Sequence, residues 1–95
     1  MMSELRVLGL QVFDRIKEAG RTQSVLSRYA HCIRTRLGFH ELTSEVCSRD
    51  GFIILELAGD SGEWDKLQKE LGDIGGLNLQ VMSFDLVGDL PKNII

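Results

Sequence analysis

Apolar and polar side chains alternate with a two-residue period in several stretches of the chain, which predicts β-strands. In residues 5–13 and 52–58 both alternating sets are largely apolar, so each stretch is expected to be a strand buried on both faces. Residues 77–84 form a similar last strand. Residues 33–39 instead place apolar side chains on one face and two arginines on the other, a pattern that an edge strand tolerates. The chain therefore predicts a sheet with central and edge strands.

A three- and four-residue spacing of apolar side chains predicts a first helix at residues 22–31. Thr22 or Ser24 is expected to cap its first turn, because a hydroxyl accepts hydrogen bonds from the exposed backbone amides there. The preceding residues 14–21 are polar and contain Gly20, so we interpret them as a connection that can include a helical turn around Ile16 and Ala19. The helix is expected to pack on the sheet through Val25, Leu26 and Tyr29.

A second helix is predicted at residues 62–74, after a break in the strand pattern at residues 59–62. Asp60 or Ser61 is its expected cap. The apolar stripe of this helix begins at Trp64, which we interpret as an anchor in the core because a large aromatic side chain contributes most when buried. The other members of the stripe are Leu67, Leu71 and Ile74.

These elements follow the order strand, helix, strand, strand, helix, strand, which predicts an α+β fold of the ferredoxin-like type. Right-handed crossovers place the first and third strands at the centre of a four-stranded antiparallel sheet, with both helices on one face. This single domain is expected to span residues 1–85. Residues 86–95 are interpreted as a tail that is flexible or packs on a neighbouring subunit.

The helices cover only one face of this sheet, so the second apolar face of residues 5–13 and 52–58 needs another cover. A second copy of the subunit is the expected partner, which predicts a homo-oligomer, either a dimer or a tetramer, formed through the open sheet face. A chain of 95 residues buries only about 60 to 65% of its extended surface, so contacts between subunits would add usefully to a small core.

Charge and composition exclude several classes of function. The 11 basic and 14 acidic residues give a net charge of −3, and the basic residues are spread along the chain, so direct binding to nucleic acid is not expected. No apolar run approaches the roughly 20 residues that cross a bilayer, and Glu4 and Arg6 interrupt any signal peptide. The expected location is the cytoplasm, without membrane contact.

The polar connection predicted at residues 40–51 carries His40, Glu41 and Cys47. Imidazole and thiolate bind borderline divalent metals, so His40 and Cys47 are candidate metal ligands in a site that a symmetry mate would complete. The alternative is that His40 and Glu41 form a solvated strand end and that Cys47 is a loop thiol. The sequence requires no cofactor and leaves the identity of any cofactor open.

Arg34 and Arg36 are predicted to project together from the exposed face of the strand at residues 33–39. Two guanidinium groups there are candidates for binding an anionic effector. His40 and Glu41 are further candidate ligand-binding residues. Solvated charges that keep further strands away from a sheet edge explain the same two arginines equally well.

Catalysis has little support in the sequence, so the main expectation is a protein that is not an enzyme. The chain has no nucleophile elbow and no pair of carboxylates within an apolar segment. Cys47 with His40 is the available nucleophile and base pair, which leaves a cysteine-dependent enzyme or redox protein as an alternative. Cys32 is interpreted as a small residue packed at the end of a helix, and both cysteines as thiols.

Several segments between residues 5 and 85 carry a specific combination of residues. They are Val25-Leu26-Ser27-Arg28-Tyr29, Thr35-Arg36-Leu37-Gly38-Phe39-His40-Glu41, Cys47-Ser48, Gly51-Phe52-Ile53-Ile54-Leu55-Glu56-Leu57 and Gly59-Asp60. In these segments the chain resembles the family of small iron-only hydrogenase system regulators. The resemblance implies an ACT-like, ferredoxin-like fold and a part in transcriptional regulation.

A weaker fold similarity relates the chain to the ligand-binding half of nickel-responsive repressors. In that family a histidine at the end of the second strand and a cysteine at the head of the third bind metal between subunits, which implies comparable places for His40 and Cys47. Together with the open sheet face, the resemblances favour a regulatory, ligand-sensing domain that acts through oligomerisation and a partner protein. A metal sensor at a subunit interface is the alternative.

Overall fold

The computed structural model describes residues 3–13, 15–39 and 51–86 of the chain. Its strands and helices follow the predicted order, with a short 3-10 helix, η1, before the second strand. The elements are β1 (Ser3–Val12), α1 (Arg15–Arg28), η1 (Ala30–Cys32), β2 (Ile33–Phe39), β3 (Gly51–Leu57), α2 (Ser61–Gly72) and β4 (Leu77–Leu86).

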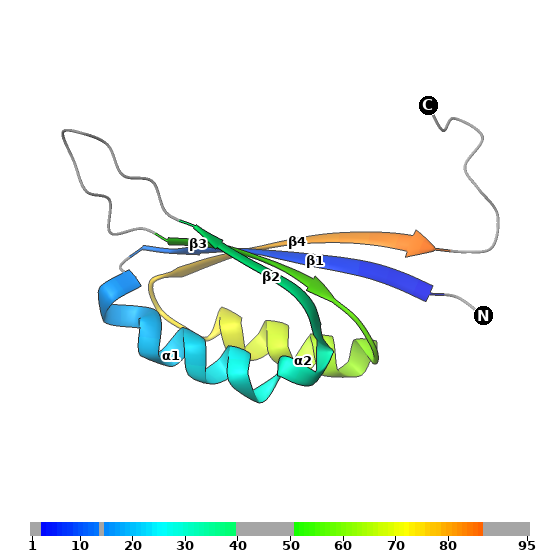
Figure 1. The fold of residues 1–95 in the computed structure, drawn as a ribbon, viewed down its shortest axis with the longest axis horizontal. Helices are drawn as coiled ribbons and strands as arrows, with labels where there is room; N and C mark the ends of the chain where they lie inside the picture. Colours follow the sequence, from blue (N-terminus) through cyan, green and yellow to red (C-terminus); the bar gives the residue numbers. More distant parts are fainter. Residues whose placement is uncertain (1–2, 14, 40–50, 87–95) are drawn as a thin grey trace, which may run out of the picture.

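The four strands of the described residues form one antiparallel sheet in the order β2-β3-β1-β4. α1 and α2 pack side by side against one face of this sheet and make a second layer (Figure 1). β1 and β3 are therefore the central strands, as predicted, and β2 and β4 are the edges. This architecture confirms the α+β, ferredoxin-like fold.

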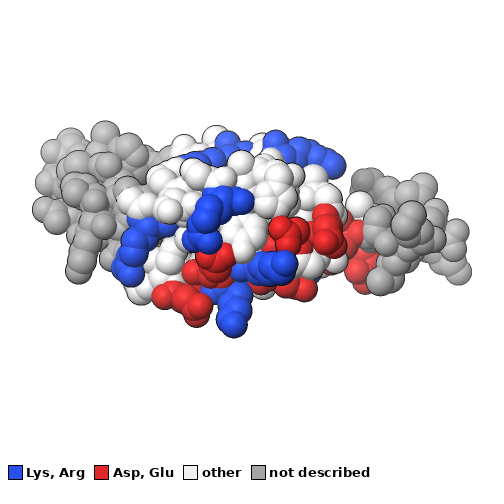
Figure 2. Space-filling model, turned by 90° about the horizontal axis from the view of Figure 1, so that it is seen from below, with Lys and Arg blue, Asp and Glu red and all other residues white. Residues whose placement is uncertain are grey.

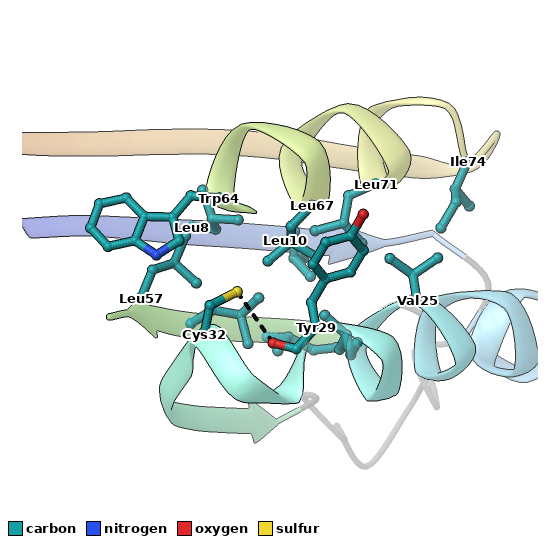
Figure 3. Packing of buried hydrophobic residues seen from close by; sticks show 13 residues of the cluster. Leu8, Leu10, Val25, Tyr29, Cys32, Leu57, Trp64, Leu67, Leu71 and Ile74 are labelled. Atoms are coloured by element: carbon teal, nitrogen blue, oxygen red, sulfur yellow. Dashed lines mark hydrogen bonds between the residues drawn. The ribbon is translucent and has the colours of Figure 1, made fainter. Parts of the chain in front are cut away.

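The core lies between the sheet and the helices. Every second residue of the central strands points into it, including Leu8 of β1 and Leu55 of β3, which are both 0% exposed. The helices contribute buried side chains between Trp64 at one end and Ile74 at the other (Figure 3). The intervening residues of β1 and β3 lie on the opposite face, which we call the open face, so the predicted alternation is confirmed.

α1 begins earlier than the sequence predicted. The interpretation of residues 15–21 as a connection is wrong, because the helix starts at Arg15 and continues through Gly20; the helical turn expected around Ile16 and Ala19 is part of it. A glycine within a helix costs about 1 kcal/mol relative to alanine, and packing of the rest of the helix on the sheet offsets that amount. The predicted caps are also wrong: Thr22 and Ser24 lie inside the helix, and Thr22 is buried with no hydrogen-bond partner for its hydroxyl among the described residues.

The end of α1 is shorter than predicted, because the helix stops at Arg28 and the chain continues through η1. Cys32 closes η1 as a buried free thiol whose Sγ donates to the Tyr29 carbonyl oxygen at 3.3 Å (Figure 3). The interpretation of Cys32 as a small residue packed at a helix end is confirmed. Burial raises the pKa of this thiol, which disfavours its thiolate form.

α2 agrees closely with its prediction. Its cap is Asp60, whose carboxylate Oδ1 accepts a hydrogen bond from the Gly62 amide at 3.1 Å. Gly59 has a φ of 88°, a conformation that favours glycine and that turns the chain from β3 into the cap. Trp64 is buried, and its indole Nε1 donates to the Ala58 carbonyl oxygen at 2.8 Å, so its interpretation as a core anchor is confirmed.

β2 contains a bulge that the sequence did not reveal. Ile33 pairs with Leu57 and Thr35 pairs with Glu56, so Arg34 is an extra residue in β2. The extra residue reverses the alternation for the rest of the strand. The prediction that Ile33, Thr35 and Leu37 share one face is therefore wrong: Ile33 packs against the core, and the other two lie on the open face.

β1 and β4 extend beyond the helical layer as a two-stranded ribbon (Figure 1). β4 pairs with β1 from Leu77 to Leu86, whereas β3 pairs with β1 only from Val7 onward. β4 thus includes Leu86, one residue beyond the predicted domain end at residue 85. The remainder of the predicted tail lies outside the described residues.

Candidate functional site

The open face of the sheet is the apolar surface that no described element covers. Its exposed residues come from three strands: Leu37 of β2 is 58% exposed, Ile54 of β3 40% and Met82 of β4 55%. Phe84 is also exposed on this face, opposite Leu5 of β1. Exposed apolar side chains that gather in one patch are typical of a surface that binds another molecule.

A shallow groove runs across the middle of the open face, along β1. It consists of two adjoining depressions of about 210 and 250 Å³, which share Gly9, Ile54 and Gln80 in their linings. Gly9 pairs with Ile54 on one side and with Gln80 on the other. The groove is hollow at this point because Gly9 has no side chain to fill the space between its two neighbours.

One end of the groove is lined by carboxamides. Gln80 Nε2 donates to Asn78 Oδ1 at 3.3 Å, and Asn78 Nδ2 lies 3.5 Å from Gln11 Oε1. These three side chains are polar but uncharged. The groove therefore offers an apolar floor with neutral hydrogen-bonding groups beside it, and no charge of its own.

The charged groups of the open face are confined to its β2 side. Among the described residues that face this way, Glu56 is the carboxylate; it accepts a hydrogen bond from Thr35 Oγ1 at 2.9 Å and lies 3.6 Å from Arg34 Nη1. Both contacts are within the subunit. The part of the open face formed by β1 and β4 is uncharged over its described residues.

The two arginines predicted as ligand-binding residues do not act together in the structure. Arg34 lies beside Glu56 of the open face, whereas Arg36 Nη2 donates to Gln23 Oε1 of α1 at 2.6 Å, on the helical side. The bulge at Arg34 separates them, so the prediction that they share a face is wrong. Their role in binding an anion stays a prediction for each arginine separately.

His40, Glu41 and Cys47 lie outside the described residues, so their predicted roles in ligand or metal binding stay predictions. Within the described ranges, no group of three or more His, Cys, Asp and Glu side chains is placed to hold a metal ion. His31 is instead close to Glu63, with 3.0 Å between Nε2 and Oε1.

A polar cluster at the end of the helical side centres on Arg6 of β1. Its guanidinium donates to Glu4, to Asp65 Oδ1 at 2.7 Å and to Gln68 Oε1 at 3.0 Å, and it lies 5.3 Å from the centre of the Trp64 ring. The hydrogen bond from Arg6 lowers the pKa of Glu4, and the Ser83 hydroxyl lowers it further. The cluster ties β1 to α2, a structural role that alternation alone did not predict.

Further ion pairs join the helices to each other and to η1. Glu70 accepts hydrogen bonds from the Tyr29 hydroxyl and lies 2.7 Å from Arg28, and the Tyr29 bond is the main cause of its lowered pKa. Glu63 has a lowered pKa chiefly because Lys66 donates to it. Acidic and basic side chains are intermixed over the helical layer (Figure 2). These charges are arranged to pair within the subunit.

Comparison with known proteins extends the description of the fold. No protein-family model matches the chain, and no curated protein matches it. Solved structures do match. An uncharacterized protein from Thermotoga maritima superposes with a TM-score of 0.71 at 23% identity, over 85% of this chain and 98% of that one.

Two further structures show how widely this fold is used. CPII from Thiomonas intermedia K12, a nitrogen regulatory PII-like protein bound to ADP, AMP and bicarbonate, has a TM-score of 0.60 at 9% identity, over 95% of this chain and 100% of that one. A formyltetrahydrofolate deformylase from Pseudomonas putida KT2440 has a TM-score of 0.50 at 13% identity, over 82% of this chain and 28% of the enzyme. At these identities the similarity establishes the shared fold.

No helix among the described residues is long and apolar enough to cross a membrane. Several of the exposed large apolar side chains, among them Leu37, Ile54 and Met82, instead lie on the open face of the sheet. The open face with its central groove is therefore the candidate functional site.

Proposed function

We propose that this chain is a regulatory, ligand-sensing domain that is not an enzyme and that works as a homo-oligomer. The observation that carries the proposal is the open face, which gathers exposed apolar side chains from β2, β3 and β4 and has no cover within the described residues. A monomer gains nothing from exposing Leu37, Ile54 and Met82 together, whereas a subunit interface gains from burying them.

The fold supports a regulatory role in general terms. Ferredoxin-like domains of this size serve many functions, and a PII-like regulatory protein is among the solved structures that share the fold. The specific kind of regulator is proposed because residues 25–29, 35–41 and 51–57 resemble iron-only hydrogenase system regulators. We therefore assign the chain to that kind of regulator, acting through a partner protein.

A non-catalytic role fits the chemistry of the candidate site. The titratable group on the described part of the open face is Glu56, which is engaged by Thr35 and Arg34. Cys32, the described thiol, is buried and has a raised pKa. Cys32 lacks the exposure that a nucleophile requires, and Glu56 is held by contacts with Thr35 and Arg34.

Two measurements on the full chain test the proposal. Sedimentation equilibrium at micromolar concentration should give the mass of a dimer or a tetramer. Calorimetric titration with amino acids and with divalent metals should then give a saturable heat for one ligand class. A monomer that binds none of these compounds, and that recovers no partner in a pull-down from cell extract, contradicts the proposed function.

Native mass spectrometry decides whether the metal-sensing alternative applies. Protein purified from cells without added chelator should show the oligomer mass, and a further mass increment equal to a metal ion would favour a sensor that uses His40 and Cys47. If the increment persists in a variant with both His40→Ala and Cys47→Ser, those two residues are not the ligands.

A further inference from the structure

Gly9 occupies a position at which the subunit itself does not need a glycine. It lies in the interior of the central strand β1, where glycine costs about 0.5 to 1 kcal/mol relative to residues with side chains. Its φ is not positive, so the backbone there suits any residue. A Cβ at Gly9 would lie 3.9 Å from Ile54 Cδ1 and 4.0 Å from Gln80 Cβ, which are ordinary contacts.

The absence of a side chain at Gly9 therefore shapes the outer surface of the subunit and is not required by its internal packing. It leaves the hollow at the centre of the open face, between Ile54 and Gln80. A glycine inside a strand marks a bulge, a bend or the close approach of another molecule. The pairing of β1 with β3 and β4 continues in register through Gly9, which excludes the bulge. The uncovered hollow at this position favours the close approach of another molecule over a bend.

The chemistry of the hollow selects an apolar, uncharged occupant. Its floor is formed by Gly9 and Ile54, and its polar neighbours are the neutral carboxamides of Asn78 and Gln80. The hollow is also shallow and open to one side. A small molecule in it would keep much of its surface in water, whereas typical ligand sites bury about 70 to 90% of the ligand surface. A second surface that covers the hollow is therefore a better occupant than a small molecule.

A second copy of the chain provides a surface of the right kind. Two identical faces meet around a two-fold axis, and every residue close to that axis lies near its own copy. A charged side chain there would repel itself, but the described residues of β1 and β4 on the open face carry no charge. The same face bears long apolar side chains that project beside the hollow, including Met82, which pairs with Val7 two residues from Gly9.

We infer that the hollow at Gly9 receives the Met82 side chain of a second copy when two open faces pack against each other. In a dimer whose two-fold axis passes between Gly9 and Met82, the Met82 side chain of each copy fills the hollow of the other. Packed sheets lie about 10 Å apart, so their side chains must interdigitate, and an unbranched methionine fits an irregular recess well. The inference rests on the proposed self-association and specifies the residues, Gly9 and Met82, that meet between the two copies.

The test is an exchange of side chains across the interface. Gly9→Leu fills the hollow and Met82→Ala removes its occupant, and each variant should raise the dimer dissociation constant about tenfold or more in sedimentation equilibrium. In the double variant, Gly9→Leu with Met82→Ala, the new leucine of one copy meets the space left at position 82 of the other, so the two surfaces are complementary again. Its dissociation constant should return toward the wild-type value.

Gly9→Ala is the matched control, because its single methyl group leaves most of the hollow open and should change the dissociation constant little. Circular dichroism at a concentration below the dissociation constant checks that each monomer is folded. If Gly9→Leu associates as tightly as the wild type, or if the double variant is as weak as the sum of the single changes, the inference is wrong while the proposed oligomer stands.

Two other results would overturn more than the inferred contact between Gly9 and Met82. A wild-type chain that stays monomeric contradicts both the inference and the proposed self-association. A monomer whose calorimetric binding of a small molecule is abolished by Gly9→Leu would show that the hollow is a ligand pocket. That outcome would overturn the second copy as occupant and would retain ligand sensing.

Discussion

The two faces of the sheet are built from neighbouring residues of the same strands, yet they meet different surroundings. On β3, Leu55 points into the core and is 0% exposed, whereas the adjacent Ile54 lies on the open face and is 40% exposed. On β1, Leu8 fills the core and the adjacent Gly9 leaves a hollow. The helical face buries most of its apolar side chains within one subunit, and the open face presents apolar side chains that no described element covers.

This difference separates folding from assembly. Side chains of the helical face determine whether the monomer folds, because their burial is complete before any partner arrives. Side chains of the open face are expected to matter mainly after folding, through association. Substitutions on the two faces should therefore have different consequences for the free energy of unfolding and for the dissociation constant.

The largest effect is expected for Leu55→Ala. Removing a fully buried leucine leaves a cavity, and the free energy of unfolding should fall by about 3 kcal/mol. Ile54→Ala, on the open face, should lower it by less than about 1 kcal/mol. Urea denaturation at a concentration at which the chain is monomeric gives both values, and equal losses for the two variants would mean that the faces do not differ as described.

A smaller loss is expected when the cap of α2 is removed. Asp60→Ala deletes the acceptor for the Gly62 amide, and the free energy of unfolding should fall by about 1 kcal/mol. Asp60→Asn keeps an acceptor oxygen and is the matched control, with an expected loss of only a few tenths of that amount. Both variants should leave the dissociation constant unchanged, since α2 lies on the helical side.

A gain in stability is expected for Thr22→Val. The Thr22 side chain is 1% exposed, and its hydroxyl has no hydrogen-bond partner within the described residues. Replacing an unsatisfied hydroxyl with a methyl group of similar size should raise the free energy of unfolding by about 1 kcal/mol. Thr22→Ser retains the hydroxyl, so a denaturation curve in which serine stabilises as much as valine would contradict the explanation.

The smallest effect is a pH dependence from Glu4. Arg6 and Ser83 lower the pKa of Glu4 in the folded chain, so its carboxylate adds stability above the pKa of the unfolded chain. That contribution is lost as the pH falls through the lowered folded pKa. Denaturation curves of the wild type and of Glu4→Gln should differ at neutral pH and converge under acid conditions. A difference that persists below the folded pKa would assign it to another cause.

The sequence was sufficient to predict the fold, because periodicity records which side chains are buried. Leu8 and Leu55 fall on the core face as the two-residue alternation requires, and Trp64 lies in the apolar stripe of α2. The start of α1 was not predicted, because Gly20 and its polar neighbours are typical of a connection. Packing against the sheet outweighs that local preference in the folded chain.

The candidate site was predicted only in outline. The open apolar face follows from two-faced strands, but the bulge at Arg34 depends on strand register, which no residue type in β2 specifies. The bulge is what separates Arg34 from Arg36. The hollow at Gly9 did have a signal in the sequence, a glycine inside an otherwise apolar strand. That signal does not locate a hollow without the strand register, which places Ile54 and Gln80 on either side of Gly9.

The bulge has one more consequence, for growth of the sheet by hydrogen bonding. An edge with an irregular register is a poor template for another strand, whereas β4 pairs with β1 without a register shift along Leu77 to Leu86 and offers a regular outer edge. Strand addition between copies is therefore favoured at β4 over β2. Addition at β4 of both copies ends at a closed pair and does not propagate into a fibre.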